Sequence, residues 1–417
     1  TSPITVTTAA GVATVACPTC GGTSPAPTAF GNMVGGIHEL GITTQFAVLG
    51  ANTNATFFNT PVSVAGYLRS LGLYNTATAP NGSVGRIGHI VNQIGAANSI
   101  VPHGVSVFSG QAAGAYQDTV TVARVEAGDY YSLRTFREST TVTSAIGSWS
   151  AEFVPDGTAA PLFGMLQATL ALSSTNFLGL VGSTSAIATE TEVGMPVPFT
   201  MTLSRFCVTT STAQSATGSL VLTVRDSGLS TSLAITIPAG GALGLYCNLS
   251  NTASLTGGTD WTAIQVVNNA TVASADVQGW TVAHAAASGT LWAVCGTAGI
   301  FVGSGTTAYW APLTASANIP EISATIPYAG RNAATATNFY VYIGGAAGGA
   351  GSNTVFTVRE NLAASAMTVT VAGVGTGIFA GTGTLAFTQG ETFSLQFAQT
   401  GGVNSGIMGG FCFSIAP

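Results

Sequence analysis

The chain contains an internal repeat, and this repeat restricts the possible folds more than any other feature. Three large aromatic residues, Trp149, Trp280 and Phe411, follow a glycine by one or two positions and are spaced by 131 residues each. Two equal gaps of that size rarely arise by chance, so a unit of that length occurs three times. Such a unit has the size of a common domain. We expect the three aromatic residues to be equivalent core anchors.

Two further patterns recur in the same order before each aromatic anchor. The first is an apolar run that ends in glycine and is followed by a proline. It occurs at 46–50 with Pro61, at 177–182 with Pro196, and at 300–303 with Pro320. The second is a turn glycine, an acidic residue and an aromatic strand. It occurs at 128–133, 258–264 and 390–395.

The second and third units also share a central block. Residues 222–226 match residues 356–360, and an alternating strand follows at 233–237 or at 367–371. The first unit has residues 118–122 in that place. Alternation of apolar residues with threonine at a period of two is typical of half-buried strands.

Along the rest of the chain, short β-prone runs alternate with Gly, Ser, Asn and Pro turns about every ten residues, which is typical of sandwiches and barrels. The sequence therefore predicts an all-β fold of three tandem jelly-roll-like β-sandwich repeats behind an extended N-terminal arm. The predicted boundaries are 1–40 for the arm and 41–158, 159–287 and 288–417 for the repeats.

The arm contains two β-prone runs, Ile4–Thr8 and Val12–Val15, and then Cys17 and Cys20. Because an unpaired strand exposes backbone donors and acceptors, we expect the arm to pair with a sheet edge of a neighbouring subunit. The lone Cys-x-x-Cys lacks the second pair of ligands that a zinc site needs. We interpret it as a local disulfide or a cross-link between subunits, with free buried thiols as the alternative.

Charged residues are scarce and restrict the possible partners. They make up 6% of the chain, against about 25% in a typical soluble domain, and all nine basic residues are arginine. We interpret this as a surface that neighbouring subunits cover, with a hydroxyl-rich secreted protein as the alternative. Dispersed arginines at a net charge of −6 argue against nucleic acid. No uninterrupted apolar run approaches the about 18 residues of a membrane helix, so membrane insertion is not expected.

No pattern of catalytic or metal-ligating residues appears. The four histidines lie too far apart in sequence for a metal motif: His38, His89, His103 and His284. Glu190 and Glu192 are expected on one strand face at a spacing compatible with paired-carboxylate hydrolysis, but no aromatic cluster accompanies them in sequence. The glycine-rich run 344–351 lies between two predicted strands and is expected to be a hairpin loop.

Arg225-Asp226 and Arg359-Glu360 occupy matching places in two repeats, which indicates a structural turn or ion pair in each repeat. A single active site would not be duplicated in this way. We therefore expect a protein that is not an enzyme and that binds no cofactor and no catalytic metal.

The turn-acid-aromatic strand and the later Gly-aromatic strand together resemble the C1q/TNF-like jelly roll of exosporium surface glycoproteins and phage fibre proteins. The third unit, from Ile326 to Phe413, is most similar, and the arm is not covered. The resemblance implies a jelly-roll fold, trimer-like packing of aromatic faces, and a role in surface assembly or attachment. It brings no catalytic residues, and the Gly-X-Y collagen stalk of the exosporium type is absent.

These observations lead to two hypotheses about function. The first is a structural subunit of a self-assembling extracellular or virion surface structure, such as a fibre, spike or coat, whose partners are other copies of itself. The second is an adhesin or receptor-binding tip that binds host-surface glycans through exposed aromatic loops. Both place the protein outside the cell, at a cell surface or on a virion.

Overall fold

The computed structural model describes the chain in segments, most of them after residue 59. The described residues are 5–9, 12–16, 38–39, 45–47, 60–75, 78, 85–92, 99–107, 110–120, 122–137, 145–166, 170–184, 186–289, 291–301, 307–310, 312, 317–319, 321–328, 330, 332–345, 353–373, 375–400 and 407–416. Regular structure in these segments is almost entirely β-strand, with one short helix, α1 (Glu321–Ala324), and one 3₁₀ turn, Glu190–Glu192. The expectation of an all-β fold of β-sandwich repeats is confirmed.

Repeat 1 consists of two facing five-stranded sheets. One has the order β10-β6-β12-β3 with β9 also paired to β6, and the other has the order β4-β11-β7-β8 with β5 also paired to β11. The strands are β3 (His38–Glu39), β4 (Gln45–Ala47), β5 (Thr60–Pro61), β6 (Gly66–Asn75), β7 (Gly85–Asn92), β8 (Ser99–Val107), β9 (Gly114–Asp118), β10 (Ala123–Val125), β11 (Tyr130–Arg137) and β12 (Ala145–Pro155).

Repeat 2 also has two five-stranded sheets. Their orders are β15-β13-β22-β17-β20 and β14-β21-β18-β19, and β16 is also paired to β21. The strands are β13 (Ala160–Leu166), β14 (Ser174–Leu178), β15 (Gly182–Thr184), β16 (Met195–Pro196), β17 (Met201–Thr210), β18 (Leu220–Asp226), β19 (Leu229–Ile237), β20 (Gly244–Leu255), β21 (Trp261–Asn268) and β22 (Val277–Ala286).

Repeat 3 has sheets of five and six strands. Their orders are β23-β33-β27-β30, with β31 also on β27, and β25-β24-β32-β28-β29, with β26 also on β32. The strands are β23 (Trp292–Phe301), β24 (Thr307–Trp310), β25 (Ala317–Ile319), β26 (Ile326–Pro327), β27 (Ala334–Gly345), β28 (Asn353–Glu360), β29 (Ala363–Ala372), β30 (Gly377–Ala380), β31 (Leu385–Phe387), β32 (Thr392–Thr400) and β33 (Ile407–Ala416).

The closing strands β12, β22 and β33 pair with β6, β17 and β27 in the same register. Each aromatic anchor lies opposite an apolar residue of the partner strand: Leu73↔Trp149, Val208↔Trp280 and Val341↔Phe411. Further along the same strands the pairs are Leu68↔Phe153, Leu203↔His284 and Ala336↔Ile415. Between these two pairs every partner strand carries one residue more than the closing strand, so the β-bulge recurs in all three repeats.

Alternation along the strands builds a separate core in each repeat. On β18, for example, Leu220, Leu222 and Val224 are buried, and the residues between them are only partly covered. Side chains of a strand point alternately to its two faces, so each sheet directs one apolar face at the other sheet of its repeat. The anchors Trp149, Trp280 and Phe411 are at most 2% exposed and belong to the cores of repeats 1, 2 and 3.

Three sequence assignments within the repeats were wrong. Residues 118–122 are not the counterpart of 233–237. The strand of repeat 1 that corresponds to β19 and β29 is β8, because β8 pairs with β7 as β19 pairs with β18 and β29 with β28. Residues 300–303 are not the counterpart of 177–182, because Phe301 is the last residue of β23. The strand of repeat 3 that corresponds to β14 is β24, since β24 pairs with β32 as β14 pairs with β21. The proline equivalent to Pro61 and Pro196 is Pro327 rather than Pro320.

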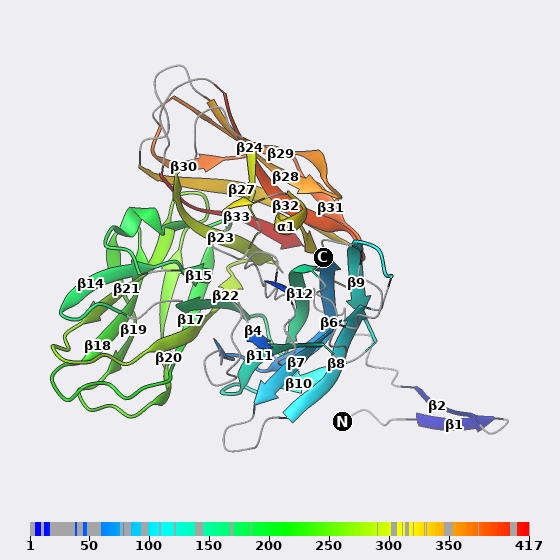
Figure 1. The fold of residues 1–417 in the computed structure, drawn as a ribbon, viewed down its shortest axis with the longest axis horizontal. Helices are drawn as coiled ribbons and strands as arrows, with labels where there is room; N and C mark the ends of the chain where they lie inside the picture. The colour runs from blue at the N-terminus through cyan, green and yellow to red at the C-terminus, as the bar shows by residue number, and fades with distance from the viewer. Residues whose placement is uncertain are drawn as a thin grey trace.

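The N-terminal segments differ in how they pair. β1 (Thr5–Ala9) and β2 (Val12–Ala16) pair with each other in an antiparallel two-stranded sheet that stands apart from the sandwiches (Figure 1). β3, which the sequence assigned to the arm, pairs instead with β12 of repeat 1. The predicted boundaries after 158 and after 287 fall in the links β12–β13 and β22–β23. No helix in the described part of the chain is long and apolar enough to span a membrane.

The three repeats pack around a common centre and form a closed ring (Figure 1). A short strand that ends in proline packs each repeat against a neighbouring repeat. β5 of repeat 1 packs on β22 of repeat 2, β16 of repeat 2 packs on β33 of repeat 3, and β26 of repeat 3 packs on β12 of repeat 1. We call these interfaces seam 1–2, seam 2–3 and seam 3–1. The cyclic order gives one chain the arrangement of a closed trimer.

Candidate functional site at the seams between repeats

Glycines permit close backbone approach at all three seams. A Cβ atom on Gly279 would lie 3.0 Å from the hydroxyl oxygen of Thr60 in seam 1–2. A Cβ on Gly410 would lie 3.0 Å from the carbonyl oxygen of Gly194 in seam 2–3. In seam 3–1 the position equivalent to Gly279 and Gly410 is a serine, and Gly72 meets the ring of Pro327 instead. Glycine beside the aromatic anchors therefore serves the packing of one repeat on another.

Two positions can be compared between the seams. One lies on the strand that pairs with the short proline-ending strand, and the other lies on the neighbouring repeat. The residues paired with the seam prolines are Tyr130, Trp261 and Thr392. The residues next to Leu73, Val208 and Val341 on the facing strands are Tyr74, Thr209 and Tyr342. The corresponding positions are therefore Tyr130 and Thr209 in seam 1–2, Trp261 and Tyr342 in seam 2–3, and Thr392 and Tyr74 in seam 3–1.

Only seam 2–3 combines two aromatic residues at these positions. The rings of Trp261 and Tyr342 are stacked, with their centroids 5.0 Å apart and their planes at 19°. Gly194 makes room for both, because a Cβ there would lie 2.5 Å from Tyr342 and 2.8 Å from Trp261. Offset stacking of this kind is a favourable arrangement for aromatic side chains.

A cleft of about 580 Å³ opens beside this aromatic pair. It lies between repeats 2 and 3, at the end of β27. Its lining residues are Thr191, Gly258, Thr259, Trp261, Tyr342, Ile343, Gly344, Thr376, Gly377 and Ile378. Gly344 was expected in a hairpin loop, but it belongs to β27 and packs against the backbone of Thr191.

An ion pair stands behind the cleft. Arg225 donates from Nε to Oε1 of Glu190 over 3.0 Å, and both side chains are largely buried. Burial and the charge of Glu190 raise the pKa of Tyr342 to about 12, so its hydroxyl stays protonated at neutral pH. Glu190 and Glu192 lie on a 3₁₀ turn, so the prediction that they share a strand face was wrong.

The same ion pair recurs in repeat 3, where Arg359 donates to Glu321 of α1. Glu321 in turn raises the pKa of Tyr74 across seam 3–1, after the larger effect of burial. Each arginine therefore binds a glutamate that precedes the seam strand. The acidic residue that follows the arginine in sequence is not the partner in either salt bridge.

Seam 3–1 is held by polar contacts. Ser150 Oγ donates to the carbonyl oxygen of Pro327 over 2.6 Å, and Gln117 Nε2 donates to the carbonyl oxygen of Tyr328 over 2.6 Å. Arg69 and the fully buried Glu152 form an ion pair at 2.6 Å on the same sheet.

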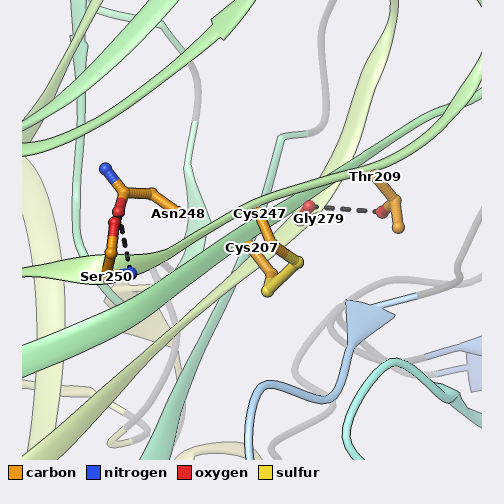
Figure 2. The surroundings of a disulfide bond; sticks show 6 residues. All are labelled: Cys207, Thr209, Cys247, Asn248, Ser250 and Gly279. Atoms are coloured by element: carbon orange, nitrogen blue, oxygen red, sulfur yellow. Dashed lines mark hydrogen bonds between the residues drawn. A yellow bond between two sulfur atoms is a disulfide. The ribbon is translucent and has the colours of Figure 1, made fainter.

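In the described part of the chain, two disulfides cross-link strand pairs that the sequence did not predict. Cys207–Cys247 joins β17 to β20 within repeat 2 (Figure 2), and Cys295–Cys412 joins β23 to β33 within repeat 3. Cys295 and Cys412 are fully buried, and they pack with the core of repeat 2 across seam 2–3. Cys247, in contrast, is exposed.

We expect a mild reductant to break Cys207–Cys247 in the folded protein and to leave Cys295–Cys412 intact, because thiol exchange requires access to a sulfur atom. Alkylation of the folded protein followed by peptide mass spectrometry measures this. Labelling of Cys412 at the rate of Cys247 would show that seam 2–3 opens in the folded state.

Cys17 and Cys20 lie outside the described residues, so their predicted disulfide or cross-link stays a prediction. The aromatic anchors lie in the cores and not in the seams. Trp280 Nε1 donates to the carbonyl oxygen of Leu180 over 2.9 Å, which satisfies its one donor. None of the three anchors lines the cleft.

His284 is a fully buried titratable group at the core position that Phe153 and Ile415 occupy in the other repeats. Its Nδ1 lies 2.8 Å from the carbonyl oxygen of Ala160, and its Nε2 accepts from the backbone N–H of Ala293. Burial lowers its pKa to about 4. The neutral ring therefore joins β22 to the first strand of repeat 3.

Among the described residues, no three His, Cys, Asp or Glu side chains are grouped so that they could hold a metal ion.

Comparisons with known proteins leave the family open. No protein-family model matches the chain, and no curated protein matches it. Among solved structures, it is similar to the mosquito-larvicidal Cry4Aa toxin of Bacillus thuringiensis, at 9% identity and a TM-score of 0.21 over 86% of this chain and 53% of the toxin. The chain thus spans about half of the toxin's length.

Two viral structures are also similar. The Macrobrachium rosenbergii nodavirus matches at 8% identity and a TM-score of 0.13, over 63% of this chain and 96% of the viral chain. Infectious bursal disease virus strain Gx matches at 9% identity and a TM-score of 0.11, over 94% of this chain and 80% of the viral chain. At these scores none of the similarities supports an argument about function.

Proposed function

We propose that the chain is a structural subunit of a self-assembling surface structure, outside the cell or on a virion, built from C1q/TNF-like jelly rolls. The observation that carries the proposal is the closed ring of three sandwiches. The seams bury the inward faces of the repeats inside one chain. The folded unit then presents its remaining faces and its separate β1–β2 hairpin to other copies.

The surface chemistry supports an assembling role. With 6% charged residues, the chain has little of the electrostatic repulsion that keeps ordinary proteins apart. Several of the described charges are already paired inside a repeat, as in Arg225–Glu190 and Arg359–Glu321. A surface of hydroxyl and small side chains can be covered by another subunit without burying unpaired charges.

The two disulfides support a location outside the reducing cytosol. Disulfides form and persist mainly in oxidising compartments and on exposed particles. Cys295–Cys412 closes 117 residues, and a link of that span stabilises the fold chiefly by restricting the unfolded chain.

The β1–β2 hairpin is the element we expect to join subunits. A two-stranded sheet leaves both outer edges without partners, and such edges pair readily with other sheets. Because β1 and β2 pair with each other, the directional contact expected of the arm would be made by a hairpin: the hairpin of one subunit would add to a sheet edge of the next.

Deletion of residues 1–22 is expected to abolish assembly without unfolding the repeats. Electron microscopy of the purified full chain should show ordered particles or filaments. The deleted chain should sediment as a discrete species and melt at nearly the same temperature.

A chain of equal length with a Gly-Ser segment in place of residues 1–22 is the matched control, and it should also fail to assemble. If both variants form particles as before, assembly runs through the sandwich faces and the hairpin is passive. If the full chain itself remains a discrete species at every concentration, the structural role is wrong.

A further inference from the structure

We propose that the cleft of seam 2–3 is a binding site for a neutral carbohydrate. This inference does not depend on the assembly role, because a discrete unit and an assembled particle would both present the cleft. Four properties of the cleft carry it: a fixed aromatic platform, a rim of hydroxyl groups, the lack of charge, and the difference between this seam and the other two.

The aromatic platform is held in place by its backbone. The N–H of Trp261 donates to Ser227 Oγ over 3.2 Å, and the N–H of Ser227 donates to the carbonyl oxygen of Trp261 over 2.8 Å. The indole is half-buried and stacked on Tyr342. A flat, rigid aromatic surface at the wall of a cleft suits the C–H face of a pyranose ring, which is apolar and loses little on leaving water.

The rim supplies groups that match sugar hydroxyls. Thr191 and Thr376 bring hydroxyl groups, each able to donate and to accept a hydrogen bond. The hydroxyl of Thr259 donates within its own turn and can accept a hydrogen bond. Gly258, with φ of 76°, and Gly377, with φ of 105°, expose backbone in conformations that other residues rarely adopt. Pockets of about 300–1,000 Å³ with aromatic walls and a few polar groups are typical of small-molecule sites.

The absence of charge selects an uncharged ligand. None of the ten residues that line the cleft is charged. Glu190, whose charge acts on Tyr342, is bound by Arg225, and Tyr342 remains protonated at neutral pH. The carboxylate of Asp260 accepts from the backbone N–H of Thr256 and from the hydroxyl of Thr259. An anionic ligand would lose its hydration here without gaining a partner charge.

The equivalent seams show that the platform is not required for packing the repeats. At the corresponding positions seam 1–2 has Tyr130 and Thr209, and seam 3–1 has Thr392 and Tyr74. Seams 1–2 and 3–1 therefore pack with one aromatic residue at these positions. The second aromatic residue of seam 2–3 is not needed for packing and can contact a ligand. A smaller pocket of about 250 Å³ at Ser173 lacks any aromatic residue in its lining.

Tryptophan fluorescence offers a direct test, because Trp261 is the one tryptophan near solvent. The other four are at most 2% exposed: Trp149, Trp280, Trp292 and Trp310. We would titrate the full chain with cellohexaose, chitohexaose and maltohexaose, and separately with sialyllactose as an anionic probe. At least one neutral oligosaccharide should shift the emission with a dissociation constant of about 0.1–1 mM, the range of a single weak site.

Two variants locate the binding. Thr376→Arg fills the cleft from an exposed position and should weaken binding at least tenfold without changing the melting temperature. Trp261→Ala should remove both the signal and the binding, the latter measured by calorimetry. The matched controls are Thr376→Ser and Tyr130→Ala, the aromatic residue at the equivalent place of seam 1–2, and both should bind as the parent does.

The proposal is overturned if none of the three neutral oligosaccharides binds up to about 10 mM, a level at which even very weak sites are occupied. It is also overturned if sialyllactose binds more tightly than all three, since the site would then select an anion. Equal loss of binding in Tyr130→Ala and Trp261→Ala would place the site elsewhere. None of these binding results bears on the assembly role, because particle formation is measured separately.

Discussion

Replacing Trp280 with alanine is expected to lower the free energy of unfolding by about 3–5 kcal/mol, the cost of deleting a large buried aromatic side chain. The indole is fully buried in the core of repeat 2 and donates to the carbonyl oxygen of Leu180. Gly164 lies directly against the ring, and a glycine has no side chain that could move into the space left behind. Denaturant titration of the variant and the parent measures the loss.

Trp261→Ala is the internal control for this experiment. Its indole is only half-buried, so its removal should cost clearly less than that of Trp280. Trp149→Ala should behave like Trp280→Ala, because the two residues occupy the same register position in different repeats. A loss for Trp280→Ala below about 1 kcal/mol, the range of surface changes, would contradict the core assignment.

Acidification from pH 6.5 to pH 4 is expected to remove about 3 kcal/mol of stability through His284 alone. Its pKa is about 4 in the folded protein and 6.5 in the reference state. The unfolded chain therefore takes up the proton first as the pH falls. The stabilisation is fully present above pH 6.5 and is lost progressively toward pH 4. Protonation would also set an Nε2–H against the backbone N–H of Ala293, which now donates to that nitrogen.

His284→Phe isolates this contribution. Phenylalanine occupies the equivalent position in repeat 1, at Phe153, so the core can accept an aromatic ring there. The stability of the variant should depend less on pH between 4 and 6.5, as measured by denaturant titration at several pH values. If parent and variant lose equal stability over this interval, another group is responsible.

The sequence predicted the fold best where one face of a strand is buried and the other is not. The block at 222–226 and the alternation at 233–237 fall on β18 and β19, whose buried apolar residues face the core. The same reasoning failed at 118–122, where the alternating valines Val120 and Val122 are exposed. The true counterpart, β8, contains Pro102 and Gly104, which interrupt the pattern.

The candidate site could not be read from the sequence, because it depends on contacts between repeats. Trp261 and Tyr342 belong to different repeats, and only the packing of repeat 2 on repeat 3 brings their rings together. The disulfides present the same difficulty, since Cys295 and Cys412 are opposed across two strands at the two ends of repeat 3. The one signal in the sequence was the glycine before Trp280 and before Phe411. These glycines mark where two repeats pack together, but they do not show which side chains line the cleft.

The covalent connection of the repeats changes what a single substitution can do. In a ring of three identical chains, every change appears at all three interfaces at once, and a residue that suits binding at one must be tolerated by the packing of the others. Here Trp261 occurs at one seam only, and the corresponding positions of the other two seams hold Tyr130 and Thr392. One interface can therefore be specialised while the other two keep the ring closed, and each ring would carry a single ligand rather than three.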